Sequence, residues 1–307
     1  MKKLLILLFS LLVSFNSYGE TGCSEKDDKE DFIDSTIYFQ ERGGLFYLPN
    51  QSEPYSGENL CVYKNASGQY YLKGEIRKGK RHGKWIWWHE DGQKKKVINF
   101  SQGRQTSETK YTYNEKGQIK NEWNFKKGKL VSQTDFEYYE NSQKKAERNY
   151  KDGKLDGKLT EWYENGQIKR EAIAKNGKFD GMLTTWHKNS QLKMKGNLVD
   201  GEENGKWTEW YENGRINREV EDYKLGIKNG KFTAWYENGQ IEIMSNFIDG
   251  KLDGKNTSWY ENGQKVFEEN YKDGELDGKM TGWDRDGKKI IKRKYKDGEC
   301  ISGDCPD

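Results

Sequence analysis

The sequence has little of the material from which compact cores are usually built. Of its 307 residues, 32% are hydrophobic and 34% are charged, whereas soluble domains average about 45–50% apolar residues, glycine included, and about 25% charged ones. The 53 basic and 50 acidic side chains nearly cancel, and no lysine and arginine cluster forms the basic stripe that nucleic-acid binders need. We therefore expect neither one large core nor a nucleic-acid partner.

Signatures of catalysis and of metal or cofactor binding are missing from the sequence as well. It contains three histidines, no His-Glu-x-x-His pair, no phosphate-binding glycine loop and no Gly-x-Ser-x-Gly elbow. Loops of the type Asp-Gly-Lys-Leu-Asp-Gly lack the further carboxylates of a calcium loop, and turn formation explains their aspartates and glycines. The sequence predicts a chain that is not an enzyme and has no catalytic, cofactor-binding or metal-binding residues.

Aromatic residues are abundant, and they recur at a fixed spacing. The unit WYENGQIKREAIAKNGKFDG, which begins at Trp162, returns in altered form at Trp210, Trp235 and Trp259. A constant period of this length indicates a repeat architecture. The turn residue of each unit recurs every 24 or 25 residues, which defines ten units, the first a partial one: Gly68, Gly92, Gly117, Ser142, Gly166, Ser190, Gly214, Gly239, Gly263 and Gly287.

Each unit is typical of a β-hairpin. Asn-Gly between two alternating segments favours a tight type I′ turn, in which both central residues have positive φ. Serine replaces glycine at Ser142 and Ser190, so those turns are either strained or of another type. The second turn of each unit, which contains Asp-Gly, is expected to be wider than the Asn-Gly turn. Connections this short allow only antiparallel neighbours, so we expect an all-β fold: an elongated array of about ten antiparallel hairpins in a single twisted sheet, over residues 45–298.

The pattern breaks in three places, and function should be sought there. Residues 101–135 lose the second glycine, which predicts a bend or splay of the sheet. One extra residue near Glu219 to Tyr223 indicates a β-bulge. The third place is the pair of cysteine-bearing ends of the array, formed by an acidic and mixed leader (20–44) and a tail (299–307).

The N-terminus resembles a secretory signal peptide. Two lysines precede an apolar run of 12 residues from Leu4 to Phe15, and small residues allow cleavage between Gly19 and Glu20. The sequence thus predicts export to the periplasm, the cell envelope or the medium. An uncleaved anchor and a lipoprotein acylated at Cys23 are the alternatives; the second is less favoured, since no aliphatic residue stands three places before that cysteine.

Four cysteines in an exported chain favour disulfides. Cys300 and Cys305 are close enough in sequence to form a local bridge, which would leave Cys23 with Cys61. Each bridge would then fasten one end of the array. Unpaired thiols are the alternative.

The repeat itself resembles a known family. The pattern Gly-Lys-x-x-x-Trp-Tyr-Glu-Asn-Gly-Gln, followed by an aromatic residue and Asp/Asn-Gly-Lys, is similar to the MORN repeat variant of bacterial YwqK-type proteins, and the resemblance covers about residues 42–298. It implies an elongated array of β-hairpins. It also implies an antitoxin role, because YwqK-type proteins are often labelled as antitoxins, and contacts with proteins or phospholipids.

The aromatic ladder has a structural and a functional interpretation. Its tryptophans are expected to cover a thin sheet, whereas the tyrosines beside the turns are candidates for a binding face: Tyr163, Tyr211, Tyr236 and Tyr260. We expect an exported, non-enzymatic scaffold for protein–protein interaction. The alternatives are a YwqK-type antitoxin or immunity protein and a binder of surface glycans or phospholipids. The sequence indicates neither the identity of the partner nor the oligomeric state.

Overall fold

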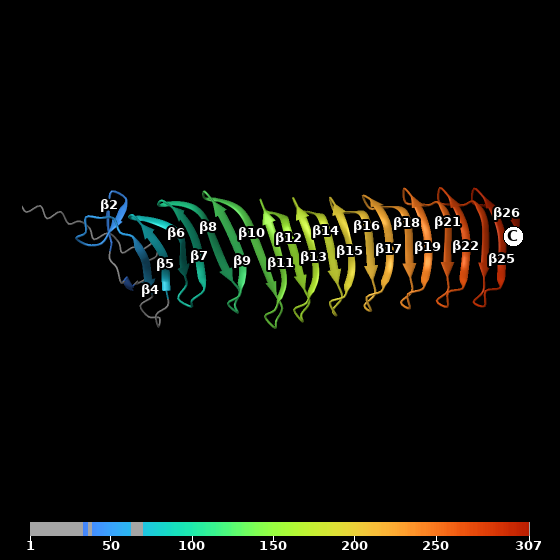
Figure 1. Cartoon of the computed structure of the whole chain (residues 1–307), viewed down its shortest axis with the longest axis horizontal. Helices are drawn as coiled ribbons and strands as arrows, with labels where there is room; N and C mark the ends of the chain where they lie inside the picture. Colours follow the sequence, from blue (N-terminus) through green and yellow to red (C-terminus); the bar gives the residue numbers. More distant parts are fainter. Residues whose placement is uncertain (1–32, 36–38, 63–69, 307) are drawn as a thin grey trace, which may run out of the picture. The chain divides into compact units, whose positions relative to one another are not determined.

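The computed structural model describes residues 33–35, 39–62 and 70–306. These residues form strands and turns without a helix, so none of their segments is a helix that could span a membrane. The chain divides into two compact units, Met1–Val131 and Ser132–Asp307. In each, successive strands pair antiparallel with their neighbours in the sequence and are joined by short turns (Figure 1). The expectation of an all-β array of antiparallel hairpins is confirmed.

Unit 1 contains one sheet and a separate two-stranded hairpin. The hairpin pairs β2 (Gln40–Arg42) with β3 (Leu45–Tyr47), so it crosses the expected boundary between leader and array. The sheet has the spatial order β1, β4, β5, β6, β7, β8, β9. The strand bounds are β1 Ile33–Ser35, β4 Gly57–Val62, β5 Tyr70–Arg77, β6 Lys80–Trp88, β7 Lys94–Ser101, β8 Arg104–Tyr113 and β9 Ile119–Lys126.

Unit 2 continues the same hairpin pattern from within β10 (Lys129–Tyr138) to β26 (Glu299–Gly303). The expected tail therefore forms the last strand of the sheet. The strands between them are β11 Lys144–Lys151, β12 Lys154–Trp162, β13 Ile168–Lys175, β14 Lys178–Trp186, β15 Leu192–Val199, β16 Glu202–Trp210, β17 Ile216–Lys224, β18 Ile227–Trp235, β19 Ile241–Ile248, β20 Lys251–Leu252, β21 Gly254–Trp259, β22 Lys265–Lys272, β23 Glu275–Leu276, β24 Gly278–Trp283 and β25 Lys289–Lys296.

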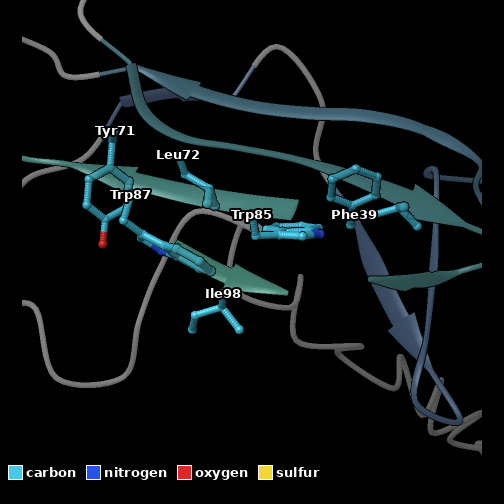
Figure 2. Packing of buried hydrophobic residues seen from close by; sticks show 7 residues of the cluster. Phe39, Tyr71, Leu72, Trp85, Trp87 and Ile98 are labelled. Carbon is cyan, nitrogen blue, oxygen red and sulfur yellow. The ribbon is translucent and has the colours of Figure 1, made fainter. Parts of the chain in front are cut away.

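The best-packed core lies in unit 1 (Figure 2). Trp85 and Trp87 are almost fully buried, and the indole nitrogen of Trp85 donates to the Glu75 carbonyl at 3.1 Å. The ring of Trp85 lies so close to Gly74 that a Cβ there would be 2.2 Å from it, so glycine is required. The other buried members are Phe39, Tyr71, Leu72, Ile76 and Ile98.

Unit 2 has a thinner core. Its described residues are sheet strands and their turns, so no second layer from within the unit covers either face. Many of its buried apolar side chains are small or medium in size, such as Ala146, Leu159, Ala172 and Val220. The large exception is Trp207, whose ring packs over Gly196. Stability in this unit therefore depends on contacts between neighbouring strands.

The two turns of each repeat are the reverse of the expected types. In the Asp-Gly turn, both Asp152 (φ 49°) and Gly153 (φ 74°) have positive φ, and they form the two-residue loop of a type I′ hairpin between β11 and β12. In the Asn-Gly turn, Gly166 has positive φ but Asn165 does not. There the Gly166 N–H donates to the Tyr163 carbonyl at 2.9 Å and the Tyr163 N–H to the Gln167 carbonyl at 2.8 Å. This is a type I turn followed by a glycine bulge.

Serine occupies the left-handed position of this bulge in two repeats. Ser142 (φ 70°) and Ser190 (φ 68°) keep the same turn hydrogen bonds as the glycines. The turn type is therefore retained and the serines adopt a strained conformation, the first of the two expected alternatives. Of the ten tracked turn residues, Gly68 lies outside the described residues.

The two breaks within the array have different outcomes. The register between β17 and β18 shifts between Val220 and Asp222, which confirms the bulge expected near Glu219 to Tyr223. Within unit 1, β8 is ten residues long and pairs with both β7 and β9. The expected splay is therefore absent from this strand, because the missing Asp-Gly bulge lets it run on without interruption.

Candidate binding faces of the repeat array

The sheet of unit 2 has two faces, which we name after residues of β12. The threonine face carries Lys158, Thr160 and Trp162, and the leucine face carries Leu159 and Glu161. Residues paired directly across antiparallel strands point to the same face. One row of direct partners can therefore be followed along the threonine face: Thr160, Glu171, Thr184, Lys195, Thr208, Glu219, Thr233, Met244, Thr257, Glu268, Thr281 and Lys292.

The four candidate tyrosines form a hydrogen-bonded ladder between repeats. Each is partly buried at the first position of a type I turn. The hydroxyl of Tyr163 donates to the Trp186 carbonyl at 2.7 Å, and those of Tyr211, Tyr236 and Tyr260 donate to the matching tryptophan carbonyl of the next repeat at 2.8–3.1 Å. Their hydroxyls therefore join neighbouring hairpins, and a role in ligand binding stays a prediction.

Burial favours the protonated form of three of these hydroxyls. It raises the pKa of Tyr163, Tyr211 and Tyr236 above the ordinary value of 10.0, and nearby carboxylates, first Glu212 for Tyr163 and Glu242 for the other two, raise it further. A protonated phenol is the donor that the ladder needs. The ladder is thus stable throughout the neutral range.

The turn asparagines form a second ladder. The Asn165 side-chain oxygen accepts from the Gln167 N–H at 3.1 Å within its own turn, and its amide nitrogen donates to the Lys188 carbonyl of the next turn at 3.3 Å. Asn213 and Asn238 repeat both bonds. Aspartate could accept but not donate, so asparagine suits a turn that has another repeat beyond it.

The tryptophan before each turn is only partly buried. Trp162, Trp186 and Trp210 share this environment, unlike the buried Trp207. Two apolar side chains of the threonine face are more open still, since Ile173 is 40% and Met182 is 46% exposed. This face therefore presents apolar surface that the described part of unit 2 leaves uncovered.

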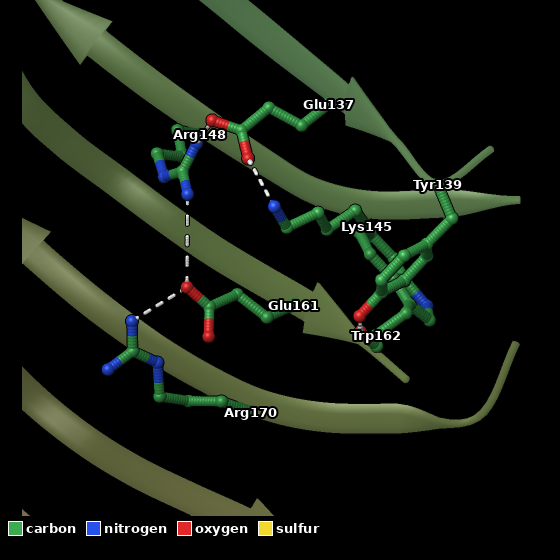
Figure 3. A network of polar contacts seen from close by, with 7 residues as sticks. All are labelled: Glu137, Tyr139, Lys145, Arg148, Glu161, Trp162 and Arg170. Atoms are coloured by element: carbon green, nitrogen blue, oxygen red, sulfur yellow. Dashed lines mark hydrogen bonds and ion pairs between the residues drawn. The ribbon is translucent and has the colours of Figure 1, made fainter. Parts of the chain in front are cut away.

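Charged side chains organise the leucine face at its N-terminal end (Figure 3). Arg148 lies 2.5 Å from Glu137 and 3.9 Å from Glu161, and Arg170 lies 2.9 Å from Glu161. These alternating charges neutralise one another across β10 to β13. They resemble a structural ladder more than a site for a charged ligand.

Lysine–glutamate pairs recur on the threonine face. Lys158 reaches Glu171 at 2.6 Å, Lys206 reaches Glu219 at 2.8 Å and Lys255 reaches Glu268 at 3.0 Å. In each pair the lysine precedes a threonine of the central row by two residues, and the glutamate lies directly opposite that threonine. The motif is thus a diagonal cross-strand pair repeated along the array.

Unit 1 contains a hollow that the sequence did not single out by residue. It has a volume of about 560 Å³, and its lining includes His89, Lys96, Lys110, Tyr113 and Trp123. It lies beside β8, where the repeat pattern breaks. The rings of Tyr113 and His89 form a T-shaped pair with centroids 6.5 Å apart, and the Tyr113 hydroxyl donates to the Lys94 carbonyl at 2.7 Å.

Cys300 and Cys305 form a disulfide with a Cα–Cα distance of 5.8 Å. It closes a short loop at the end of β26, the edge strand of unit 2. Cys23 and the cleavage residues Gly19 and Glu20 lie outside the described residues, so the pairing of Cys23 with Cys61 stays a prediction. Within the described ranges, no group of three or more histidine, cysteine, aspartate and glutamate side chains is placed to hold a metal ion.

The repeat identity follows from a family model. The model described as MORN repeat variant matches five segments of the chain, at residues 81–102, 155–176, 203–224, 228–249 and 252–273. These five repeats belong to the MORN repeat variant family. MORN repeats are a non-catalytic repeat family, and each match includes a type I turn with its glycine bulge.

Comparison with solved structures gives weaker likenesses. The crystal structure of TcdB2-TccC3-TEV is 10% identical over 78% of this chain, with a TM-score of 0.30, and the matched part is 17% of that chain. The crystal structure of TcdB2-TccC3 without its hypervariable C-terminal region is 11% identical over 80% of this chain, with a TM-score of 0.30, and the matched part is 16% of that chain. The MORN array thus spans less than a fifth of these chains. No curated protein matches the sequence.

Proposed function

We propose that this MORN array is an exported, non-enzymatic scaffold that binds a protein partner on the threonine face of unit 2. One observation carries the proposal: this face presents partly buried tryptophans and two well-exposed apolar side chains, Ile173 and Met182, that the unit itself leaves uncovered. Exposed apolar surface framed by polar residues is typical of interaction sites. The lysine–glutamate pairs around it supply the polar rim of such a site.

The opposite face is less suited to a partner. Its arginines and glutamates neutralise one another from Glu137 to Arg170, and separating them on binding would cost desolvation energy. The candidate tyrosines already donate their hydroxyls within the array. The threonine face is therefore the more favourable surface.

Export rests on the N-terminal sequence, a positive start followed by an apolar run and small residues before Glu20. Intact-mass measurement of the native protein under non-reducing conditions tests this part. A measured mass that corresponds to a chain beginning at Glu20 supports export. A full-length chain recovered from the cytoplasm contradicts it.

The binding face is tested by site-specific photocrosslinking in native cells. A photoreactive residue at Met182 on the threonine face should give one discrete adduct with a protein. The matched control is the same residue at Glu137, on the leucine face and also exposed, which should give none. Adducts of equal yield at both positions, or at neither, would refute the choice of face.

Toxin neutralisation is a narrower form of the same binding function, and it predicts that the crosslinked protein is toxic when produced alone. Binding of glycans or phospholipids is the other alternative. It predicts retention on cell-wall or anionic-lipid matrices, lost when Tyr211, Tyr236 and Tyr260 are substituted, without a protein adduct at Met182.

A further inference from the structure

The lysine–glutamate motif of the threonine face occurs in alternate repeats, and the last repeat lacks it. Thr160, Thr208 and Thr257 are opposite glutamates of the following strand. In the repeats between and after them, the residues opposite the threonine are Lys195, Met244 and, opposite Thr281, Lys292. What distinguishes the last repeat is Lys279, two residues before Thr281, which is directly opposite a second lysine, Lys294. Three lysines are therefore neighbours on this face.

The result is a cluster of unneutralised positive charge. Lys279, Lys292 and Lys294 are exposed, and no carboxylate of the described residues forms an ion pair with any of them. The nearest acid of the row, Glu268, is already held by Lys265 at 2.5 Å and Lys255 at 3.0 Å. On the other side Lys294 is opposite the uncharged Ser302 of β26.

This arrangement is unfavourable for the isolated sheet. Side chains directly opposite on antiparallel strands have their Cβ atoms about 5 Å apart, and like charges at that distance destabilise the pair. Elsewhere on this face the residue opposite the matching lysine is uncharged, such as Ile173 opposite Lys158 and Asn270 opposite Lys255. An anionic partner would remove the repulsion.

The geometry points to an extended polypeptide as that partner. Lys292 and Lys294 are two residues apart on β25, a separation of about 6.6 Å, which equals the spacing of carboxylates at alternate positions of another extended chain. Ile290, two residues earlier, is 55% exposed and offers an apolar contact at the next alternate position. We propose that this end of the threonine face, the Lys279–Lys292–Lys294 cluster with Ile290, binds an extended acidic segment of a partner protein.

The inference rests on the proposed binding function and names the chemistry of the partner. The segment needs acids at two alternate positions and an apolar residue at the third. The chain itself contains such a pattern at Asp28, Glu30 and Phe32. A synthetic peptide of residues 24–34 is therefore a probe of the right chemistry, and the same peptide with asparagine and glutamine in place of its acids is the control.

Binding of this peptide to the full chain should be measured by fluorescence anisotropy in a D28N/E30Q background, which removes competition from the chain's own acids. Lys292→Glu places opposite Thr281 the glutamate that Thr160, Thr208 and Thr257 have opposite them, and it should weaken binding at least tenfold. The matched control is Lys195→Glu, the same charge change opposite Thr184 and Thr208, which should change binding less than twofold. Binding should also weaken as salt rises.

Thermal unfolding verifies that each variant is folded, and Lys294→Gln provides a milder second variant with an expected loss of about threefold. Equal losses in Lys292→Glu and Lys195→Glu, or no loss in either, overturn the proposal. Binding of phosphatidylserine vesicles that Lys292→Glu abolishes, without binding of the peptide, overturns it in favour of a membrane. If the peptide does not bind the full chain while Met182 still gives its protein adduct, the scaffold function stands and this site falls.

Discussion

The tyrosine ladder leads to a quantitative prediction about the stability of unit 2. Tyr163→Phe keeps the ring and removes only the hydroxyl that donates to the Trp186 carbonyl at 2.7 Å. A hydrogen bond of this kind contributes about 0.5–1.5 kcal/mol net. Because the tyrosine is partly rather than fully buried, water can reach the freed carbonyl, and we expect a loss of about 1 kcal/mol.

The four tyrosines can also be changed together. Tyr211, Tyr236 and Tyr260 lie in consecutive repeats, each separated by two strands or about 10 Å, and Tyr163 lies one repeat further away. At such distances effects on stability usually add. Phenylalanine at Tyr163, Tyr211, Tyr236 and Tyr260 should therefore lower the free energy of unfolding by about 2–6 kcal/mol in total. The assay is urea unfolding followed by tryptophan fluorescence, fitted with a nearest-neighbour model because repeat arrays need not unfold in one step.

Tyr150→Phe is the matched control, since the Tyr150 hydroxyl forms no hydrogen bond with the described residues. It should leave stability within about 0.3 kcal/mol of the original chain, which is the usual size of a neutral change. If Tyr163→Phe is equally neutral, or if the fourfold variant loses no more than the single one, the ladder does not join the repeats energetically. The rings would then be free for the binding role first expected of them.

Three further perturbations test other parts of the structure. Ser142→Gly should stabilise the array by about 0.5–1 kcal/mol in the same urea assay, since it relieves a left-handed φ at a serine, and a loss would refute that strain. Burial, together with Glu269, raises the pKa of Tyr271 to about 12, so the native state keeps this proton to a higher pH than the unfolded state does. The contribution of Tyr271 to stability should therefore be complete below pH 10 and be lost between pH 10 and 12. Tyr271→Phe should make stability less dependent on pH in this window. Replacing Cys300 and Cys305 by serine should cost about 2 kcal/mol by loop entropy and accelerate amide exchange in β26, whereas unchanged exchange would show that strand pairing alone holds this edge.

The turns show how far local sequence can be interpreted. The 24- or 25-residue spacing located the nine tracked turns that lie in the described residues, because a left-handed position in a turn selects particular residues, glycine above all. The two turn types were predicted the wrong way round, because both dipeptides, Asn-Gly and Asp-Gly, suit a type I′ loop. What separates them is the carbonyl that closes each loop: the Gly166 N–H bonds to Tyr163, three residues back, whereas Lys151 pairs directly with Lys154 across Asp152-Gly153.

The candidate binding tyrosines show what local sequence does not predict. The tyrosines were recognised as recurring but expected to face a ligand, and their hydroxyls instead bond to carbonyls 23 or 24 residues further along the chain. Nothing within one repeat predicts that bond, because it depends on the stagger between successive hairpins. The hollow beside β8 was missed for the same reason, since residues as distant as His89 and Trp123 line it.

The sequence by itself determined that the chain is an all-β array of hairpins with a period of 24 or 25 residues. Alternating side chains and glycines act over a few residues, and a repeated unit repeats its local preferences. The tertiary structure alone decided which tyrosine, asparagine and lysine side chains have partners. Lys292 is one lysine among many in the sequence, and only the register shows that it lies opposite Thr281 and next to the directly opposed Lys279 and Lys294. Cross-strand register sets such contacts, and a strand acquires its register only when its neighbours are in place.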